Sequence, residues 1–289
     1  MDHFKQFTFK KFGYISIEHS EVQPFNQSRF QDFIKVVWLK AGGVITIDFK
    51  EYTLTNDAVF FINAGQWYSL ESILAGEMLY YNRDFYCIEL HDKEVACDGI
   101  LFHNVYEIPV VYLDDEQSES MRNILEEMKN EIIQEDSATE EMLRILLKKI
   151  IIKSTRIWKQ AHQVADESTK QDLEFSRKFS QLVEWHYTSR HMVSDYAEML
   201  SITPKALNKR ISKYSKISPN DIIKNRIILE AKRLLVHTNL SVKEIGYKLG
   251  YDDPAYFIRL FLKQTEVSPQ GFRKLYLSGA TREKLVTES

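Results

Sequence analysis

One short stretch near the C-terminal end combines side chains that can hydrogen-bond to DNA bases. Lysine pairs with the acceptors of guanine, and asparagine can bond adenine through two atoms. Polar residues spaced three or four apart share one face of a helix predicted from residue 204: Lys205, Asn208, Lys209 and Ser212. Leu207 and Ile211 fall on the opposite face and are expected to be buried. An ordinary solvated helix has a similar face, so this stretch alone does not decide the function.

The same plan occurs again about 50 residues further along the chain. The segment VSDYAEML at 193–200 is similar to VKEIGYKL at 242–249, and a short turn follows each. Each copy then has a cap residue and a proline, Thr203-Pro204 or Asp253-Pro254, a pair typical of helix starts. This repetition predicts two helix-turn-helix units, and the pattern of residues 219–236 predicts one long helix between them.

The second copy offers a different outward face. Phe257, Leu260 and Phe261 are predicted to point inward. The outward residues are Ala255, Ile258, Arg259 and Leu262. Of these, Arg259 offers strong hydrogen bonds to base edges, whereas Ala255 and Ile258 could touch thymine methyl groups. We therefore expect this helix to contribute mainly phosphate contacts and positioning, with little sequence reading.

The charge is divided unevenly along the 289 residues. Residues 1–174 carry a net charge of −12 and residues 175–289 carry +9, which together give the −3 of the whole chain. Such asymmetry indicates two domains with different partners, and a basic module favours a polyanion such as nucleic acid. Gly and Pro are scarce, at 10 and 6, which excludes collagen-like and low-complexity chains.

The N-terminal part is predicted to be β-rich. Short runs of β-branched and aromatic residues, broken by turn signals, cover residues 12–90, including MLYYN and FYCIE near the end. This spacing suggests a barrel or sandwich. Two amphipathic helices follow between residues 115 and 162, the second capped by Ser137 or Thr139. These helices pack on the barrel or pair with another subunit, and we favour dimerisation.

One segment of the basic half resembles the signature of the AraC/XylS transcriptional regulators. It comprises residues 228–273, with the sequence ILEAKRLLVHTNLSVKEIGYKLGYDDPAYFIRLFLKQTEVSPQGFR. The resemblance covers about residues 175–275. The specific matches are the Ala-Lys-Arg-Leu-Leu run, Ile245, Gly250-Tyr251, Tyr256-Phe257, Phe261 and Ser268-Pro269. The chain departs from the family pattern in three places: Gly246 stands where Ala is usual, Tyr251 where Phe is common, and Glu266 where Gly is usual before Val-Ser-Pro. The last change removes a residue suited to positive φ.

The resemblance implies a bacterial activator or repressor with two helix-turn-helix units, in which Lys205, Asn208, Lys209 and Arg259 contact DNA. It also implies an α+β chain with an N-terminal cupin-like β-barrel. We accordingly expect a cupin-like sensor domain at 1–114, a dimerising helical pair at 115–162, a linker at 163–174 and the double helix-turn-helix domain at 175–280. The expected partners are double-stranded promoter DNA and a second copy of the chain, while a small-molecule effector and a contact with RNA polymerase stay open.

No cofactor, metal, catalysis or membrane contact is expected, and the location expected is the bacterial cytoplasm. The first residues carry no signal-peptide pattern, and Cys87 and Cys97 are too few for a disulfide framework. Two alternatives remain: a barrel-containing small-molecule enzyme with a helical appendage, and an effector-free DNA-binding protein with a structural barrel. The enzyme alternative lacks the clustered histidines of a metal cupin. Six aromatic residues line an apolar ligand pocket or simply fill the barrel core: Trp38, Trp67, Tyr68, Tyr80, Tyr81 and Tyr86.

Overall fold

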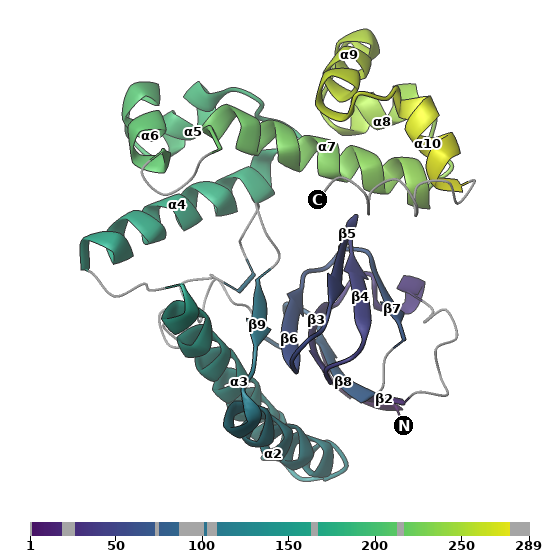
Figure 1. The fold of residues 1–289 in the computed structure, drawn as a ribbon, viewed down its shortest axis with the longest axis vertical. Helices are drawn as coiled ribbons and strands as arrows, with labels where there is room; N and C mark the ends of the chain where they lie inside the picture. The colour runs from purple at the N-terminus through teal and green to yellow at the C-terminus, as the bar shows by residue number, and fades with distance from the viewer. Residues whose placement is uncertain are drawn as a thin grey trace. The chain divides into compact units, whose positions relative to one another are not determined.

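The computed structural model describes residues 2–18, 27–72, 75–86, 101–102, 109–162, 167–212 and 217–277. The chain divides into two compact units, Met1–Lys170 and Gln171–Ser289. Unit 1 contains all the described strands together with helices α2 and α3, whereas the described part of unit 2 is entirely helical (Figure 1). The chain is therefore of the α+β class, as predicted.

Unit 1 contains two antiparallel sheets. The larger one has six strands in the order β1-β2-β8-β3-β6-β9. These strands are β1 (Asp2–Phe7), β2 (Lys10–Glu18), β3 (Ile34–Leu39), β6 (Ala58–Ile62), β8 (Ala75–Tyr81) and β9 (Val110–Tyr112). The smaller sheet has the order β5-β4-β7. Its strands are β4 (Val44–Ile47), β5 (Lys50–Thr53) and β7 (Tyr68–Glu71), and a short 3-10 helix, η2 (Gln27–Phe30), precedes β3. The prediction of a β-rich N-terminal part is therefore confirmed. The described residues form two sheets and no closed barrel, so the finer prediction of a cupin-like barrel is not confirmed.

The six-stranded sheet buries side chains on both faces, because alternate residues of a strand point to opposite sides. On β3, Val37 and Leu39 pack with Ile45 and Ile47 of the smaller sheet. Their neighbour Val36 lies in a second cluster, which faces helices α2 and α3. The sheet is thus enclosed between a second sheet and a helical pair, which explains why every residue of β3 is buried.

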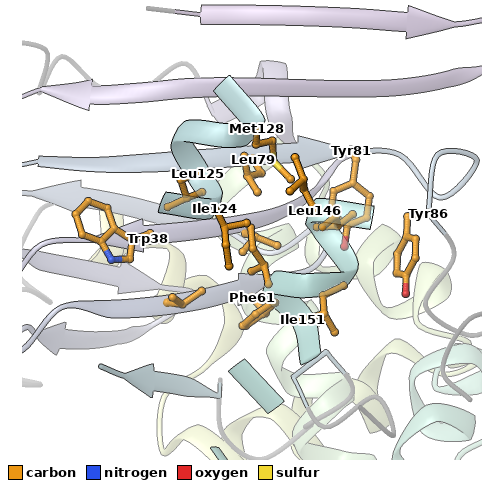
Figure 2. Packing of buried hydrophobic residues seen from close by; sticks show 14 of the residues in the cluster. Trp38, Phe61, Leu79, Tyr81, Tyr86, Ile124, Leu125, Met128, Leu146 and Ile151 are labelled. Carbon is orange, nitrogen blue, oxygen red and sulfur yellow. The ribbon is translucent and has the colours of Figure 1, made fainter. Parts of the chain in front are cut away.

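Helices α2 (Asp115–Glu131) and α3 (Thr139–Ala161) lay their apolar faces on this sheet (Figure 2). Ile124 and Leu125 of α2 meet Leu79 and Phe61 of the sheet, and Leu146 of α3 belongs to the same cluster. The regular apolar spacing of these helices therefore serves packing within the chain. The predicted dimerisation does not use the apolar face of α3 that carries Leu146 and Ile150, because Leu146 is 4% exposed and Ile150 is fully buried against the sheet of the same chain.

Several local predictions differ from the structure. The cap of α3 comes from Asp136, whose Oδ1 accepts hydrogen bonds from the backbone N–H groups of Ala138 and Thr139, at 2.8 and 3.0 Å. The expected strand FYCIE is not found in its described part, because Phe85 lies in a turn and Tyr86 in no regular element; the rest, 87–89, lies outside the described residues. Strand β1 begins well before residue 12, where the predicted β region started.

Seven helices of the described residues lie in unit 2, and the first of them, α4, begins in the last residues of unit 1. They are α4 (Glu167–His186), α5 (Val193–Met199), α6 (Pro204–Ile211), α7 (Pro219–His237), α8 (Val242–Lys248), α9 (Pro254–Thr265) and α10 (Pro269–Leu277). The long helix predicted at 219–236 is confirmed as α7. The predicted linker at 163–174 differs from the structure, because α4 begins at Glu167, and residues 163–166 lie outside the described part.

Candidate nucleic-acid interface

The first helix-turn-helix unit is formed by α5 and α6. Helix α5 ends in a tight turn in which the Ser201 N–H donates to the Glu198 carbonyl and the Ile202 N–H donates to the Ala197 carbonyl, both at 2.9 Å. Ser201 adopts a left-handed backbone conformation, with φ of 54°. Left-handed residues close helix C-termini by satisfying carbonyls that the helix leaves free. The four residues 200–203 therefore redirect the chain from α5 to α6.

The second unit repeats this turn 49 residues later. The Gly250 N–H donates to the Tyr247 carbonyl and the Tyr251 N–H donates to the Gly246 carbonyl, both at 3.0 Å. Gly250 has a φ of 82° and occupies the position equivalent to Ser201. The repeat found in the sequence is thus a repeat of backbone hydrogen bonding, and the prediction of two helix-turn-helix units is confirmed.

Both second helices begin as the cap residues predict. The Thr203 hydroxyl accepts from the Ala206 N–H at 3.2 Å, and the Asp253 carboxylate accepts from the Ala255 N–H at 2.8 Å. Pro204 and Pro254 follow as the first helical residues. A proline is suited to this position because its missing N–H would have no intrahelical partner there. The capped starts fix where each helix begins and therefore which residues face outward.

Helix α6 places the predicted base-reading residues at the surface. Leu207 and Ile211 are fully buried. The exposed face contains Lys205, Asn208, Lys209 and Ser212. The Asn208 side-chain nitrogen donates to the Pro204 carbonyl at 2.9 Å, which leaves its second N–H and its carbonyl oxygen for other partners. The face therefore offers two ammonium groups, an amide and a hydroxyl within two helical turns. That these groups contact bases stays a prediction.

Helix α9 also has one buried apolar face and one exposed face, and the exposed face carries the predicted outward residues. Phe257 and Phe261 are fully buried, and Leu260 is 8% exposed. The predicted outward residues Ala255, Ile258 and Arg259 are all exposed. Arg259 lies 3.8 Å from the Asp253 carboxylate, an exposed pair of little strength, so the guanidinium can turn toward a stronger partner.

Sequence reasoning gave too little weight to the other exposed apolar residues of the second unit. Leu262 was placed on the outward face of α9 but was not counted among the site residues, and it is 45% exposed. Tyr256 on α9 and Tyr247 on α8 are 53% and 50% exposed. The signal that could have identified them is their departure from the apolar positions that Phe257 and Phe261 define on the helical wheel.

An ionic cluster around the buried Arg226 side chain joins α4 to α7. The Arg226 guanidinium donates two hydrogen bonds to the Glu184 carboxylate, at 2.5 and 2.8 Å, and a third to Glu230 at 3.1 Å. It also lies 3.9 Å from the ring centroid of Tyr187. Because the Arg226 side chain is almost fully buried, this two-pronged pairing constrains the angle between the two helices.

A second contact connects the loop after α4 with the turn of the second unit. The His191 ring stacks on the Tyr251 ring with centroids 4.5 Å apart, and His191 Nε2 lies 3.0 Å from the Leu249 carbonyl oxygen. Arg273 of α10 donates to the Leu235 carbonyl in the last turn of α7 and to the Leu240 carbonyl in the connection to α8. The contact of His191 with Tyr251 and Leu249 thus connects the segment before α5 with the turn after α8, in addition to the connection through α7.

The aromatic residues proposed as a pocket lie on two different faces of the large sheet. Trp38, Tyr81 and Tyr86 belong to the cluster under the helices, whereas Tyr68 and Tyr80 belong to the cluster between the sheets. They therefore do not gather around one space. No group of three or more His, Cys, Asp or Glu side chains among the described residues is arranged to hold a metal ion. In the same part of the chain, no helix is both long and apolar enough to cross a membrane.

Comparison with known proteins agrees with this geometry. Residues 196–275 match the family model of a helix-turn-helix domain. The chain is 32% identical to the HTH-type transcriptional regulator YijO of Escherichia coli over 106 residues, which are 37% of this chain and 38% of YijO. It is 27% identical to the HTH-type transcriptional activator RhaS of Salmonella arizonae over 100 residues, 34% of this chain and 36% of RhaS.

Among solved structures, the C-terminal domain of AraT, a response regulator from Geobacillus stearothermophilus, is 30% identical, with a TM-score of 0.33. The match covers 34% of this chain and 83% of that domain. The chain spans less than two thirds of the length of the curated relatives it matches. The duplicated turn and the family match together define a helix-turn-helix DNA-binding module. The match of residues 196–275 and the transcriptional regulators among the relatives support the resemblance of this segment to the AraC/XylS regulators.

Proposed function

We propose that this protein is a sequence-specific DNA-binding transcription regulator whose second unit binds promoter DNA. The observation that carries the proposal is the pair of capped helices α6 and α9, presented by a duplicated turn within a segment of net charge +9. A basic surface supplies the attraction to phosphates that all DNA binding needs. The relatives that match this segment are named as transcriptional regulators, which supports the same function.

In this proposal, α6 carries most of the base reading. Lys209 and Lys205 donate to guanine acceptors, and Asn208 bonds adenine through its free N–H and its carbonyl oxygen. Ser212 bonds either a base or a phosphate. Arg259, Ala255 and Ile258 of α9 contact the neighbouring groove. No catalytic step is needed, and a bacterial cytoplasm with RNA polymerase as a further partner is the setting that fits a regulator of this family.

The experiment is selection of bound sequences from a random duplex library by the full chain. We expect one sequence to be enriched, and the chain to bind it at least ten times more tightly than a shuffled duplex of equal composition at the same salt concentration. Equal affinity for the two duplexes would contradict sequence-specific binding. Absence of binding to either would favour the alternative in which the β-rich unit is a small-molecule enzyme.

For unit 1, we propose a cupin-like fold that senses a ligand, dimerises the chain, or does both. Its two facing antiparallel sheets over a shared core support the cupin-like assignment. Dimerisation would use the outward face of α3, where Met142 and Ile145 are 40% and 47% exposed although they are apolar. Such a pair, with Met142 beside the buried stripe and Ile145 facing away from it, is suited to packing against a second copy.

Sedimentation velocity tests the dimer. We expect the wild type to be dimeric at tens of micromolar, and the double variant Met142→Glu, Ile145→Glu to be monomeric with an unchanged melting temperature. Ile133→Glu, at an exposed apolar position just after α2, is the matched control and should stay dimeric. A monomeric wild type would contradict dimerisation through α3 and would leave the DNA-binding proposal in place.

A further inference from the structure

The outward faces of α6 and α9 differ in chemistry at equivalent positions. Both helices start with a cap and a proline, so residues 50 apart occupy the same place on each helix. Three polar residues of α6 correspond to apolar residues of α9. The pairs are Lys205 with Ala255, Asn208 with Ile258, and Ser212 with Leu262. The pair Lys209 and Arg259 keeps a cation in both helices.

The apolar residues on α9 are not needed to complete the core of the second unit. That core is made by Phe257, Leu260 and Phe261 on the opposite face, with Phe257 and Phe261 fully buried. Ile258 and Leu262 are 38% and 45% exposed. A folded domain gains little from exposed aliphatic side chains, so their presence on a face that otherwise corresponds to base-reading residues indicates contact with something apolar.

We propose that α9 recognises thymine, by packing Ala255, Ile258 and Leu262 against C5-methyl groups in the major groove. The inference rests on the proposed function and specifies the bases of one half of its DNA site. The thymine methyl is the apolar group that the major groove displays, and it distinguishes thymine from the other bases. DNA is the occupant that the charge favours, because Arg259 and the exposed Lys263 lie beside the apolar residues in a segment of net charge +9.

The two halves of the site would then be read by different chemistry. Under α6, hydrogen-bonding groups select guanine and adenine. Under α9, aliphatic side chains and thymine methyl groups bury each other from water, which selects thymine. Arg259 adds a hydrogen-bonding cation beside these contacts. Burial of one methyl group favours binding by a factor of about three to five. The preference under α9 should therefore be real but weaker at each base than the preference under α6.

Replacement of thymine by deoxyuridine tests this directly, because deoxyuridine pairs identically and lacks only the C5-methyl group. Each thymine of the enriched duplex is replaced in turn, and the affinity of the full wild-type chain is measured. We expect one or more replacements to weaken binding about threefold to fivefold. These positions should lie in the half of the site that is unaffected when Lys209→Ala relaxes base preference.

The variants Ile258→Ala and Leu262→Ala close the test. Each should bind the thymine duplex more weakly than the wild type and lose the difference between thymine and deoxyuridine at one position. Both side chains are exposed, so unfolding should be unchanged. Ile133→Ala, an exposed apolar residue of unit 1, is the control and should keep the wild-type pattern.

The experiments distinguish failure of the thymine inference from failure of the proposed function. An enriched sequence whose affinity is indifferent to deoxyuridine at every thymine would overturn this inference alone. The thymine inference would also be overturned if Leu262→Ala left DNA binding intact, since the apolar face of α9 would then serve a protein partner. Failure to enrich any sequence would overturn the proposed function itself, and this inference with it.

Discussion

Gly250 lies against the backbone of Thr188, so closely that a Cβ built on Gly250 would stand 1.9 Å from the Thr188 carbonyl oxygen. Gly250 also has a φ of 82°, a conformation that residues with a Cβ rarely adopt. Two independent constraints thus require glycine where the turn of the second unit meets the loop after α4. The equivalent turn of the first unit has the left-handed backbone conformation alone, and Ser201 adopts it there.

We predict that Gly250→Ala destabilises unit 2 by at least about 2 kcal/mol, since the left-handed backbone alone costs about 1–2 kcal/mol and the Thr188 backbone must also move. Urea unfolding followed by circular dichroism measures this change. Ser201→Ala is the matched control, because a Cβ is already present at that left-handed position, and it should change stability by less than about 0.5 kcal/mol. Equal losses for the two variants would contradict the role of the Thr188 contact.

Glu266 ends α9 in a left-handed conformation, with φ of 60° and ψ of 0°. The sequence had raised the question whether glutamate could replace glycine in this turn, and the structure shows that the turn keeps the shape that favours glycine. We predict that Glu266→Gly raises the free energy of unfolding by up to about 1 kcal/mol, because glycine adopts positive φ without steric strain. Thermal unfolding checks this, and a lowered melting temperature would contradict it.

Glu77 lies on the face of β8 that α2 covers, and burial there raises the pKa of its carboxyl group. A hydrogen bond from Tyr14 and the charge of Lys129 lower this pKa, whereas the charge of Glu126 raises it further. A carboxyl whose pKa is higher in the folded than in the unfolded state opposes folding when it is ionised. The free energy of unfolding should therefore rise as the pH falls through the folded-state pKa.

We predict that Glu77→Gln stabilises the chain at pH 7.5 and that this gain shrinks as the pH falls toward 5. Melting temperatures of the two proteins across this range provide the measurement. Glu126→Gln, on the exposed side of α2, is the control and should show a smaller pH-dependent difference. A gain that grows at low pH would show that the folded-state pKa of Glu77 is lowered.

The sequence was most informative in the second unit, where local chemistry determines local structure. Thr203 and Asp253 mark helix starts by accepting a hydrogen bond from a backbone N–H of the first turn, and the prolines after them need no partner there, so both second helices and their outward faces were predicted correctly. The exposed apolar residues of α9 were visible in the sequence. Their exposure depends on how the neighbouring helices pack, which no local signal reveals.

Unit 1 was harder because its structure depends on distant partners. The apolar face of α3 has the same spacing whether it packs on a sheet or on a second subunit, and only the tertiary structure shows that Leu146 meets the sheet of its own chain. Within the described part of the chain, strand β1 lies at the edge of its sheet, pairs with β2 and leaves its side chains partly exposed, so its sequence DHFKQF lacks the apolar run of a central strand. The Asp136 cap lies three residues from Thr139, outside the usual cap position.

The most direct test of the account is the effect of Lys209→Ala on two duplexes, the enriched sequence and its shuffled control, measured at one salt concentration. If Lys209 contacts a guanine, affinity for the enriched duplex should fall by about 1–3 kcal/mol while affinity for the shuffled duplex changes much less. Equal losses would make Lys209 a phosphate contact. No loss on either duplex would contradict the claim that the exposed face of α6 reads the DNA sequence.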